Sequence, residues 1–289
     1  MEKVPPVHWI RHLVGNGIRL LLHPTALGRL ALLGTFLRIE FKRRILVELC
    51  GRRLTSEHVF GQTIHFSDYS IFALVFGEVY LTGVYYFPTR VVAPLIVDGG
   101  ANIGVSMAYF KTIYPGCRAL AFEPNGRNFE LLQQTVRANG WTGTEIYPFG
   151  LHRTAGEQWF FDYNGLPGSL SCGFWEPAEA GPAKTQTMVR TVRLSDYINE
   201  DVDLLKLDVE GSEMAILEDL KAADKLQRVR QIIAEYHHHV KPDEDRLGEF
   251  LSLLEHAGFG YHLCAVLPLP FPQRQAQNFM FSAYRKAAG

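Results

Sequence analysis

LIVDGGANIG, the stretch from Leu95 to Gly104, decides the fold. Three apolar residues lead into an acid, two glycines, a small residue and an asparagine, and helical spacing begins at Asn102. This pattern predicts a buried strand, a tight turn and the N-terminus of a helix. Glycines lack the Cβ atoms that would keep a ligand from the backbone, and free N–H groups at a helix start attract an anion. We therefore expect a ligand with a carboxylate or phosphate at this turn.

The class of ligand depends on Asp98, the acid directly before the glycines. Gly99, Ala101 and Gly104 match a dinucleotide-binding G-x-A-x-x-G pattern, so an NAD(P)-dependent oxidoreductase stays open as an alternative. A carboxylate at the strand tip would repel a pyrophosphate, but it suits a ligand with an ammonium group beside its carboxylate. S-adenosylmethionine has both groups and a sulfonium. We expect Asp98 at a solvent-accessible strand end, in contact with the ligand alone.

Composition is that of an ordinary globular protein. The 289 residues are 47% hydrophobic and 20% charged with a formal net charge of -1, which allows one α/β domain with an appendage and implies no nucleic-acid partner. The four cysteines form no C-x-x-C pair, so neither a zinc site nor disulfides are expected, and a cytoplasmic location is the default. No apolar run is uninterrupted for long enough to predict a signal peptide or a membrane-spanning helix.

The first 57 residues have helical spacing and carry ten Lys and Arg against four Glu. A solvated helix face is the favoured explanation, and the alternative is peripheral contact with the anionic inner face of a membrane or with an anionic substrate. A small hairpin is expected at residues 59–68 and a helix at 70–80, where Glu78 and Tyr80 could border the ligand pocket. The chain is thus divided into a helical N-terminal extension at residues 1–90 and a ligand-binding domain at residues 91–289.

From Leu95 onward, strands and helices alternate in the way that builds a parallel sheet. Further strands are expected at residues 118–122, 145–149, 202–209 and 229–236, with helices at 102–113, 125–139 and 243–257. The closing strands at 259–267 and 278–285 are joined by a hairpin and must be antiparallel. Residues 151–190 are longer than a simple connection, which predicts a lid or substrate-binding hairpin, or else a β ribbon at the sheet edge.

Small, polar and acidic residues follow the predicted strands, at the edge where open parallel sheets bind ligands. Glu123 ends the second strand, where its carboxylate can accept both hydroxyls of a ribose. Like Asp98, it is expected to be solvent-accessible and to contact the ligand alone. The candidate cofactor contacts at these strand ends are Asp98, Gly99, Gly100, Ala101, Asn102, Gly104, Glu123, Pro124, Asn125, Gly150 and Asp208.

Four motifs resemble the FkbM family of S-adenosylmethionine-dependent O-methyltransferases: VDGGANIG at 97–104, FEPN at 122–125, LLKLDVEGSE at 204–213, and Glu235-x-His237. The resemblance implies a class I methyltransferase (Rossmann-like) fold, whose seven-stranded, mostly parallel sheet has an antiparallel last strand. It also implies methylation of a hydroxyl on a sugar or secondary metabolite, so the acceptor is a small molecule or a glycan. Residues 98–104 would hold the methionine moiety of the cofactor and Glu123 its ribose. A catalytically silent, membrane-associated scaffold is the non-enzymatic alternative.

The predicted catalytic cluster consists of Asp208, Glu210, Glu235 and His237. His237 is the preferred base because an unperturbed imidazole is neutral near pH 7, and Glu235 shares its strand face and can orient it. Alternatively, Asp208 and Glu210 hold Mg²⁺, which acidifies the acceptor hydroxyl. A third interpretation makes the two acids a helix N-terminal cluster with Ser212 as the cap. Three consecutive histidines in a strand cannot converge on one ion, so a His-only metal site is not expected.

Overall fold

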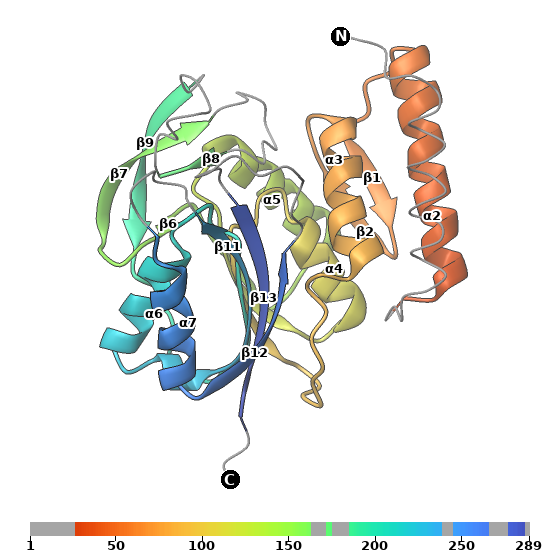
Figure 1. The fold of residues 1–289 in the computed structure, drawn as a ribbon. Helices are drawn as coiled ribbons and strands as arrows, with labels where there is room; N and C mark the ends of the chain where they lie inside the picture. Colours follow the sequence, from red (N-terminus) through yellow and green to blue (C-terminus); the bar gives the residue numbers. More distant parts are fainter. Residues whose placement is uncertain (1–26, 163–171, 175–184, 239–244, 266–276, 287–289) are drawn as a thin grey trace.

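The computed structural model describes residues 27–162, 172–174, 185–238, 245–265 and 277–286. Its centre is a seven-stranded sheet with the order β12-β13-β11-β10-β3-β4-β5 (Figure 1). The strands are β3 (Leu95–Gly99), β4 (Arg118–Phe122), β5 (Thr144–Tyr147), β10 (Val202–Leu207), β11 (Val229–His238), β12 (Phe259–Ala265) and β13 (Gln277–Arg285). Among the described strand pairs of this sheet, β13 is antiparallel to its two neighbours, β11 and β12, and the other pairs are parallel. The predicted seven-stranded, mostly parallel sheet with an antiparallel last strand is confirmed.

Both faces of the central strand β3 are covered. Ile96 packs on one face with helices α4 (Val105–Ile113) and α5 (Gly126–Asn139), whereas Val97 packs on the other with α6 (Glu213–Ala222) and α7 (Leu247–His256). Successive side chains of a strand point to opposite faces, so a strand between two helix layers is apolar throughout. This explains the uninterrupted apolar run before Asp98.

The N-terminal part consists of α2 (Arg29–Phe41), the π-type helix η1 (Lys42–Leu49), the hairpin β1 (Ser56–Val59) and β2 (Gln62–His65), helix α3 (Tyr69–Phe76) and the π-type turn η2 (Gly77–Leu81). The hairpin begins three residues earlier than predicted, because its turn lies at Phe60 and Gly61, which both have positive φ. Tyr80 is buried in the core and is not among the described residues that line the cavity at the strand ends.

The N-terminal part shares one hydrophobic core with the sheet. Phe36, Phe72 and Phe76 belong to the same cluster of buried side chains as Ile96 and Phe110. The side chain of Asn139 also accepts the N–H of Thr63 and donates to its carbonyl, both at 2.7 Å. Packing is thus continuous across residue 90, where the sequence suggested a division between extension and domain.

Much of the positive charge of the N-terminal part is paired within that part. Lys42 lies 2.8 Å from Glu57, and Arg43 lies 2.6 Å from Glu40. Arg44 lies 2.8 Å from Glu48. These ion pairs reduce the charge that remains for an anionic partner.

The helix after β3 begins at Val105, three residues later than predicted. Asn102 and Gly104 have φ of 48° and 91°, so the backbone takes left-handed turns before the helix starts. At the other end of the sheet, β11 extends two residues beyond the predicted Tyr236 and includes His237 and His238. The predicted start of the last helix and the connection between the closing strands lie partly outside the described residues.

The excursion after β5 forms a second sheet of four strands, in the order β6-β9-β7-β8. These strands are β6 (Gly150–Leu151), β7 (Gly156–Asp162), β8 (Cys172–Gly173) and β9 (Thr185–Val192). The antiparallel pair β7–β9 forms the β ribbon that was one of the two predicted outcomes, and it stands off the main sheet (Figure 1). Residues 163–171 and 175–184 of the excursion lie outside the described parts.

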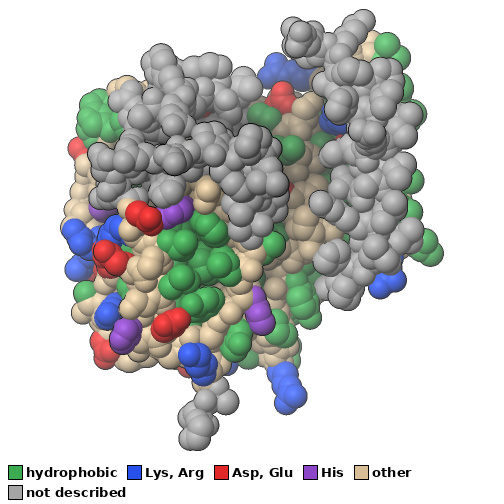
Figure 2. Space-filling view, viewed as in Figure 1, with side chains coloured by type: hydrophobic (Ala, Val, Ile, Leu, Met, Phe, Trp, Pro, Cys, Tyr) green, Lys and Arg blue, Asp and Glu red, His purple; other side chains and the backbone are tan. Residues whose placement is uncertain are grey.

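Acidic and basic side chains are interspersed over α6 and α7, without a continuous basic surface on the described part of this face (Figure 2). Among the described residues, no helix combines the length and the apolar character needed to cross a bilayer.

Candidate active site

A cavity opens at the carboxyl ends of β3, β4 and β10, and the ribbon and η2 complete its wall. It encloses about 860 Å³, open solvent at its mouth included, which is within the range of about 300–1,000 Å³ of small-molecule sites. Seven of the predicted cofactor contacts line it: Gly100, Ala101, Asn102, Glu123, Pro124, Gly150 and Asp208. The other four, Asp98, Gly99, Gly104 and Asn125, are not among the residues of its wall.

Two glycines allow the turn after β3 to pack closely against its neighbours. A Cβ on Gly100, whose φ is 80°, would lie 1.8 Å from the carbonyl oxygen of Asp208. A Cβ on Gly104 would lie 2.9 Å from Leu132 of α5. The turn therefore touches the end of β10 on one side and α5 on the other, which brings the backbone of residues 100–102 into the cavity wall.

Asp98 is fully buried, which corrects the expectation of a solvent-accessible strand end. Its carboxylate lies 3.0 Å from Nζ of Lys206 and accepts the hydroxyl of Ser106 at 2.6 Å. Lys206 also donates to the carbonyl of Gly100 at 2.6 Å. Burial alone would lower the pKa of Lys206, but Asp98 and Asp208 outweigh it and raise that pKa. Asp98 thus fixes the turn through Lys206, because a carboxylate in the protein interior needs a paired charge.

Glu123 lies at the end of β4, as predicted, but it is only 5% exposed, which corrects the expectation that it is solvent-accessible and contacts the ligand alone. Its two oxygens accept the N–H groups of Asn102 and Asn125, each at 2.8 Å. Burial raises the pKa of Glu123 to about 7, although these two N–H groups and Lys206 act in the opposite direction. The carboxylate therefore ties the end of β4 to the turn after β3 and still lines the cavity.

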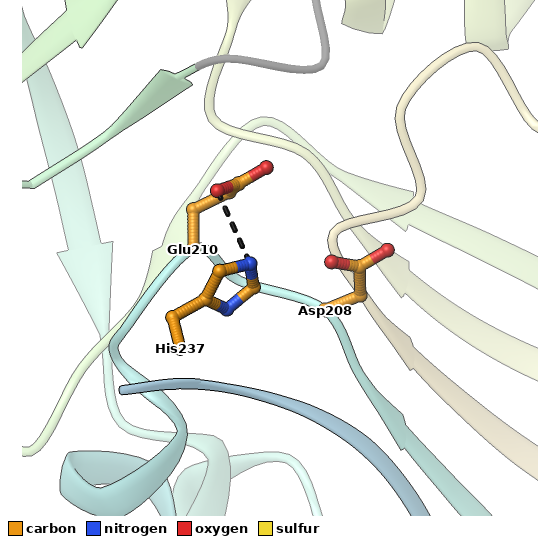
Figure 3. Close-up of side chains that lie close together, drawn as sticks. All are labelled: Asp208, Glu210 and His237. Carbon is orange, nitrogen blue, oxygen red and sulfur yellow. Dashed lines mark ion pairs between the residues drawn. The ribbon is translucent and has the colours of Figure 1, made fainter. Parts of the chain in front are cut away.

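Asp208, Glu210 and His237 come together beside the cavity (Figure 3). Nε2 of His237 lies 3.3 Å from Glu210 and 4.0 Å from Glu235. The two acids after β10 belong to the cavity wall, whereas His237 is buried behind them. His238 faces the rings of Tyr236 and Phe279 instead, so consecutive histidines lie on opposite faces as predicted. His239 is outside the described residues.

The imidazole of His237 does not keep an ordinary pKa, which corrects the premise on which it was preferred as the base. Burial favours the neutral ring, but the carboxylates of Glu213, Glu210 and Asp208 outweigh burial and raise the pKa of His237 to about 10. An imidazolium, which carries a proton on both ring nitrogens, cannot act as a base at neutral pH. Oε1 of Glu235 accepts a hydrogen bond from the side-chain amide of Asn278 at 2.6 Å. It lies 4.0 Å from Nε2 of His237, which is too far for a hydrogen bond.

Ser212 does occupy the N-cap position of α6, but its side chain makes no capping hydrogen bond. Glu213 instead accepts the N–H of Gly211 at 2.9 Å. Glu210 has a φ of 54° and therefore departs from ordinary helix or strand geometry. The loop after β10 is thus held by Glu213, and the interpretation of Asp208 and Glu210 as a helix N-terminal cluster capped by Ser212 is not supported.

Three contributors to the site were absent from the predicted set: Lys206, Tyr85 and Glu213. The hydroxyl of Tyr85 donates to Asp208 at 2.9 Å, and Nδ1 of His237 lies 2.9 Å from Glu213. Lys206 carried a signal in the sequence, since a single charge inside an apolar strand needs a buried partner. Glu213 ends the LLKLDVEGSE motif, but the motif did not reveal its contact with His237. Tyr85 carried no signal, because only the folded chain brings it to Asp208.

Glu78 lines the mouth of the cavity, which agrees with its expected place at a pocket border. The surrounding protein atoms and the carboxylates of Asp208 and Glu235 raise the pKa of Glu78 to about 7. A carboxyl group with such a pKa can exchange protons near neutral pH.

The family model described as the methyltransferase FkbM domain matches residues 98–261, more than half of the chain. This chain belongs to the FkbM methyltransferase family. The predicted class of enzyme, a methyltransferase, is thereby confirmed, and the sheet order and the antiparallel β13 confirm the class I fold.

Relatives with methyltransferase names match more than half of this chain. The 31-O-demethyl-FK506 methyltransferase FkbM of Streptomyces tacrolimicus is 31% identical over 193 residues, which are 57% of this chain and 72% of the relative. Methyltransferase sdnD of Sordaria araneosa is 27% identical over 190 residues, 56% of this chain and 73% of the relative. A solved FkbM methyltransferase from Methylobacillus flagellatus KT has a TM-score of 0.46 and 16% identity, with 95% of this chain and 59% of that chain covered.

Proposed function

We propose that this methyltransferase uses S-adenosylmethionine to methylate a hydroxyl group on a sugar of a glycoside, a polysaccharide or a secondary metabolite. One observation carries the proposal: a cavity at the carboxyl ends of the parallel strands is lined by both the glycine turn and Glu123. Backbone N–H groups at the turn suit the carboxylate of the methionine moiety, and the carboxylate of Glu123 suits the ribose hydroxyls.

The reaction is an in-line displacement in which the acceptor oxygen attacks the methyl carbon and the sulfonium leaves as a neutral thioether. No acid is needed for this leaving group. Catalysis then depends on alignment, worth up to about 7–11 kcal/mol in well-oriented systems, and on removal of the hydroxyl proton, worth about 10²–10⁴-fold. The chain has to hold the acceptor in line and receive one proton.

Aromatic side chains in the cavity wall suit a ring-shaped acceptor. Phe149, Phe160 and Phe174 line the cavity, and two of the three come from the excursion that forms the ribbon. Flat apolar side chains pack against the faces of a sugar or macrocycle, while Glu78 and Asp208 offer acceptors for its hydroxyl groups. Glu78 and Glu123 both line the cavity with a pKa of about 7, but both oxygens of Glu123 already accept backbone N–H groups, so Glu78 is the favoured base. The assignment of His237 stays a prediction.

Peripheral contact with an anionic membrane face and a cytoplasmic location also stay predictions. Among the described basic residues, Arg29, Arg52 and Arg53 have no ion pair, whereas Lys42, Arg43 and Arg44 are paired. A small basic surface of this kind would add to membrane binding only weakly, at about 1 kcal/mol per charge.

Isothermal titration calorimetry with S-adenosylmethionine and, separately, with NAD(H) tests the cofactor. We expect binding of S-adenosylmethionine at one site per chain and no binding of NAD(H). The opposite result would establish the oxidoreductase alternative. If neither ligand binds and vesicles of anionic lipid do, the silent scaffold is the better description.

The acceptor class can be tested by incubating the chain with labelled S-adenosylmethionine and a panel of glycosides, polyketides and their deoxy analogues. We expect label in an acceptor that has a free hydroxyl and none in the analogue that lacks it. Label transferred to a nitrogen or carbon nucleophile instead would contradict O-methylation.

A further inference from the structure

We propose that Asp208, Glu210 and His237 form a site for one divalent transition-metal cation, Mn²⁺ or Zn²⁺, which binds the acceptor hydroxyl. The role of the cation rests on the proposed methyl transfer. The site itself rests on the geometry of the three side chains and can be tested without any reaction.

The spacing of the three side chains suits a single ion. One ligand atom from each of them lies within 4.8 Å of the other two, and Nε2 of His237 lies 3.3 Å from Oε2 of Glu210 (Figure 3). Ligand atoms about 2.1 Å from one ion are about 3.4 Å apart in a tetrahedron, and in an octahedron they are about 3.0 Å apart when adjacent and about 4.2 Å apart when opposite. The observed separations therefore need only small adjustments to close on a cation.

A buried nitrogen that faces carboxylates supplies the second argument. The Oε1 atom of Glu213 accepts the N–H of Gly211 and lies 2.9 Å from Nδ1 of His237, so Nδ1 is the donor in that pair. Nε2 of the same ring faces Oε2 of Glu210 at 3.3 Å, inside a side chain that is 6% exposed, so the second ring nitrogen points at a carboxylate of the cluster. A metal-binding imidazole must be neutral, so a cation here would displace the proton that Nε2 shares with Glu210.

The neighbouring groups orient the proposed ligands. Glu213 behind His237 reproduces the carboxylate–histidine pairing that fixes the ring of a metal-binding imidazole. Both Tyr85 and Lys206 contact Oδ2 of Asp208, at 2.9 and 3.8 Å, and Oδ1 has no hydrogen-bond partner among the described residues. The left-handed backbone of Glu210 is a strained conformation of the kind that persists where function requires it.

The donor set indicates the class of metal. The sequence suggested Mg²⁺ on two carboxylates, but Mg²⁺ prefers oxygen ligands and an octahedron that keeps several waters. An imidazole nitrogen beside two carboxylates suits Mn²⁺, Zn²⁺ and similar cations better. Asp208 and Glu210 both line the cavity, so open positions on the ion would face the acceptor. There the ion would lower the pKa of a bound hydroxyl and hold its oxygen for attack.

Titration of the metal-free full-length chain with Mn²⁺, followed by electron paramagnetic resonance, tests the site directly. We expect one tightly bound Mn²⁺ per chain, displaced by Zn²⁺ and not by an equal concentration of Mg²⁺. Glu210→Gln and His237→Gln should each weaken binding by at least about tenfold. His238→Gln, which changes the adjacent histidine on the opposite strand face, should bind as wild type does. If His237→Gln fails to fold, Asp208→Asn replaces it, since Asp208 is partly exposed at the cavity.

Two results would overturn the inference. The first is a wild-type chain that binds neither Mn²⁺ nor Zn²⁺. The second is that Glu210→Gln and His237→Gln, or Asp208→Asn in its place, bind Mn²⁺ as tightly as wild type. Calorimetry with S-adenosylmethionine on the same metal-free chain keeps the proposals separate. Cofactor binding without metal binding rejects the metal site alone, and metal binding without cofactor binding rejects the proposed cofactor alone.

Discussion

Asp98 and Lys206 form an ion pair whose side chains are 0% and 2% exposed. Removing one partner of such a pair leaves an uncompensated buried charge and typically costs about 3–5 kcal/mol. We therefore expect Asp98→Ala to reduce the free energy of unfolding by about this amount, and not to leave the fold intact as its position at a strand tip suggested. Urea unfolding followed by circular dichroism measures the loss.

A double-mutant cycle is the control for this prediction. Asp98→Ala combined with Lys206→Met removes both charges and should recover a large part of the stability, because nothing buried is left unpaired. Losses that simply add in the double variant would show that the two side chains do not stabilise each other.

Glu78 lets the proton-transfer step be examined by its dependence on pH. If Glu78 is the base, Glu78→Gln should lower kcat by about 10²–10⁴-fold with little change in cofactor affinity. In wild type the rate should fall as the pH drops below about 7, where the carboxylate becomes protonated. A pH profile with the same acidic limb in wild type and Glu78→Gln would show that another group is titrating.

The same pKa has a consequence for stability with a definite sign. The pKa of Glu78 is raised on folding from 4.5 to about 7, so the folded chain binds this proton more tightly than the unfolded chain. Its contribution to stability is present at pH below 4.5 and is lost as the pH rises through about 7. Thermal melts of wild type should therefore weaken relative to Glu78→Gln over this interval.

At the scale of elements, the turn after β3 depends on the absence of a side chain at Gly100. Ala at this position places a Cβ 1.8 Å from the backbone of Asp208 at a φ of 80°. We expect Gly100→Ala to destabilise the chain by more than the roughly 1–2 kcal/mol that a left-handed conformation costs by itself.

Gly126→Ala is the matched control, since no atom lies within 4 Å of the added Cβ at the first residue of α5. This substitution should be neutral or stabilise by up to about 1 kcal/mol. Equal effects of the two substitutions in urea unfolding would contradict the close approach of the turn to β10.

Amide exchange in the ribbon β7–β9 will show whether the excursion acts as a lid. Phe160 of β7 lines the cavity, while Trp159 and Met188 of the same ribbon are 53% and 44% exposed. With few buried contacts, its amides should exchange faster than those of β3 and β10, and they should slow when an acceptor binds. Hydrogen exchange with mass spectrometry measures this. Equal protection of ribbon and sheet without acceptor would make the ribbon a static part of the wall.

The sequence predicted those features that depend on a residue type and its near neighbours in the chain. Glycines at 99, 100 and 104 indicated the turn, and the apolar run before Asp98 indicated a strand covered on both faces. The burial of Asp98 was missed because its partner Lys206 lies 108 residues later and meets it only through the pairing of β3 with β10. For the same reason the pKa of His237 could not be inferred, since it depends on Glu213 from another element.

At the scale of the whole molecule, the N-terminal part is predicted to be inseparable from the methyltransferase sheet. Phe36, Phe72 and Phe76 cover the α4 side of the sheet, and removing residues 1–90 would expose Ile96 and its buried neighbours. We expect residues 91–289 alone to be insoluble or partly folded, and the full chain to unfold in one cooperative transition. A well-folded fragment with its own sharp urea transition would restore the predicted division at residue 90.

The position of β13 also affects how the chain avoids self-association while it is being made. β13 follows every other strand of the sheet in sequence, yet it lies between β11 and β12. Until β13 arrives, β11 is a ten-residue edge with open hydrogen-bonding groups and apolar side chains such as Ile232 and Ile233. Exposed edges of this kind recruit strands from other molecules. Synthesis therefore passes through an interval in which aggregation competes with folding, and chaperones that shield strand edges should have their largest effect on yield before residues 277–285 emerge.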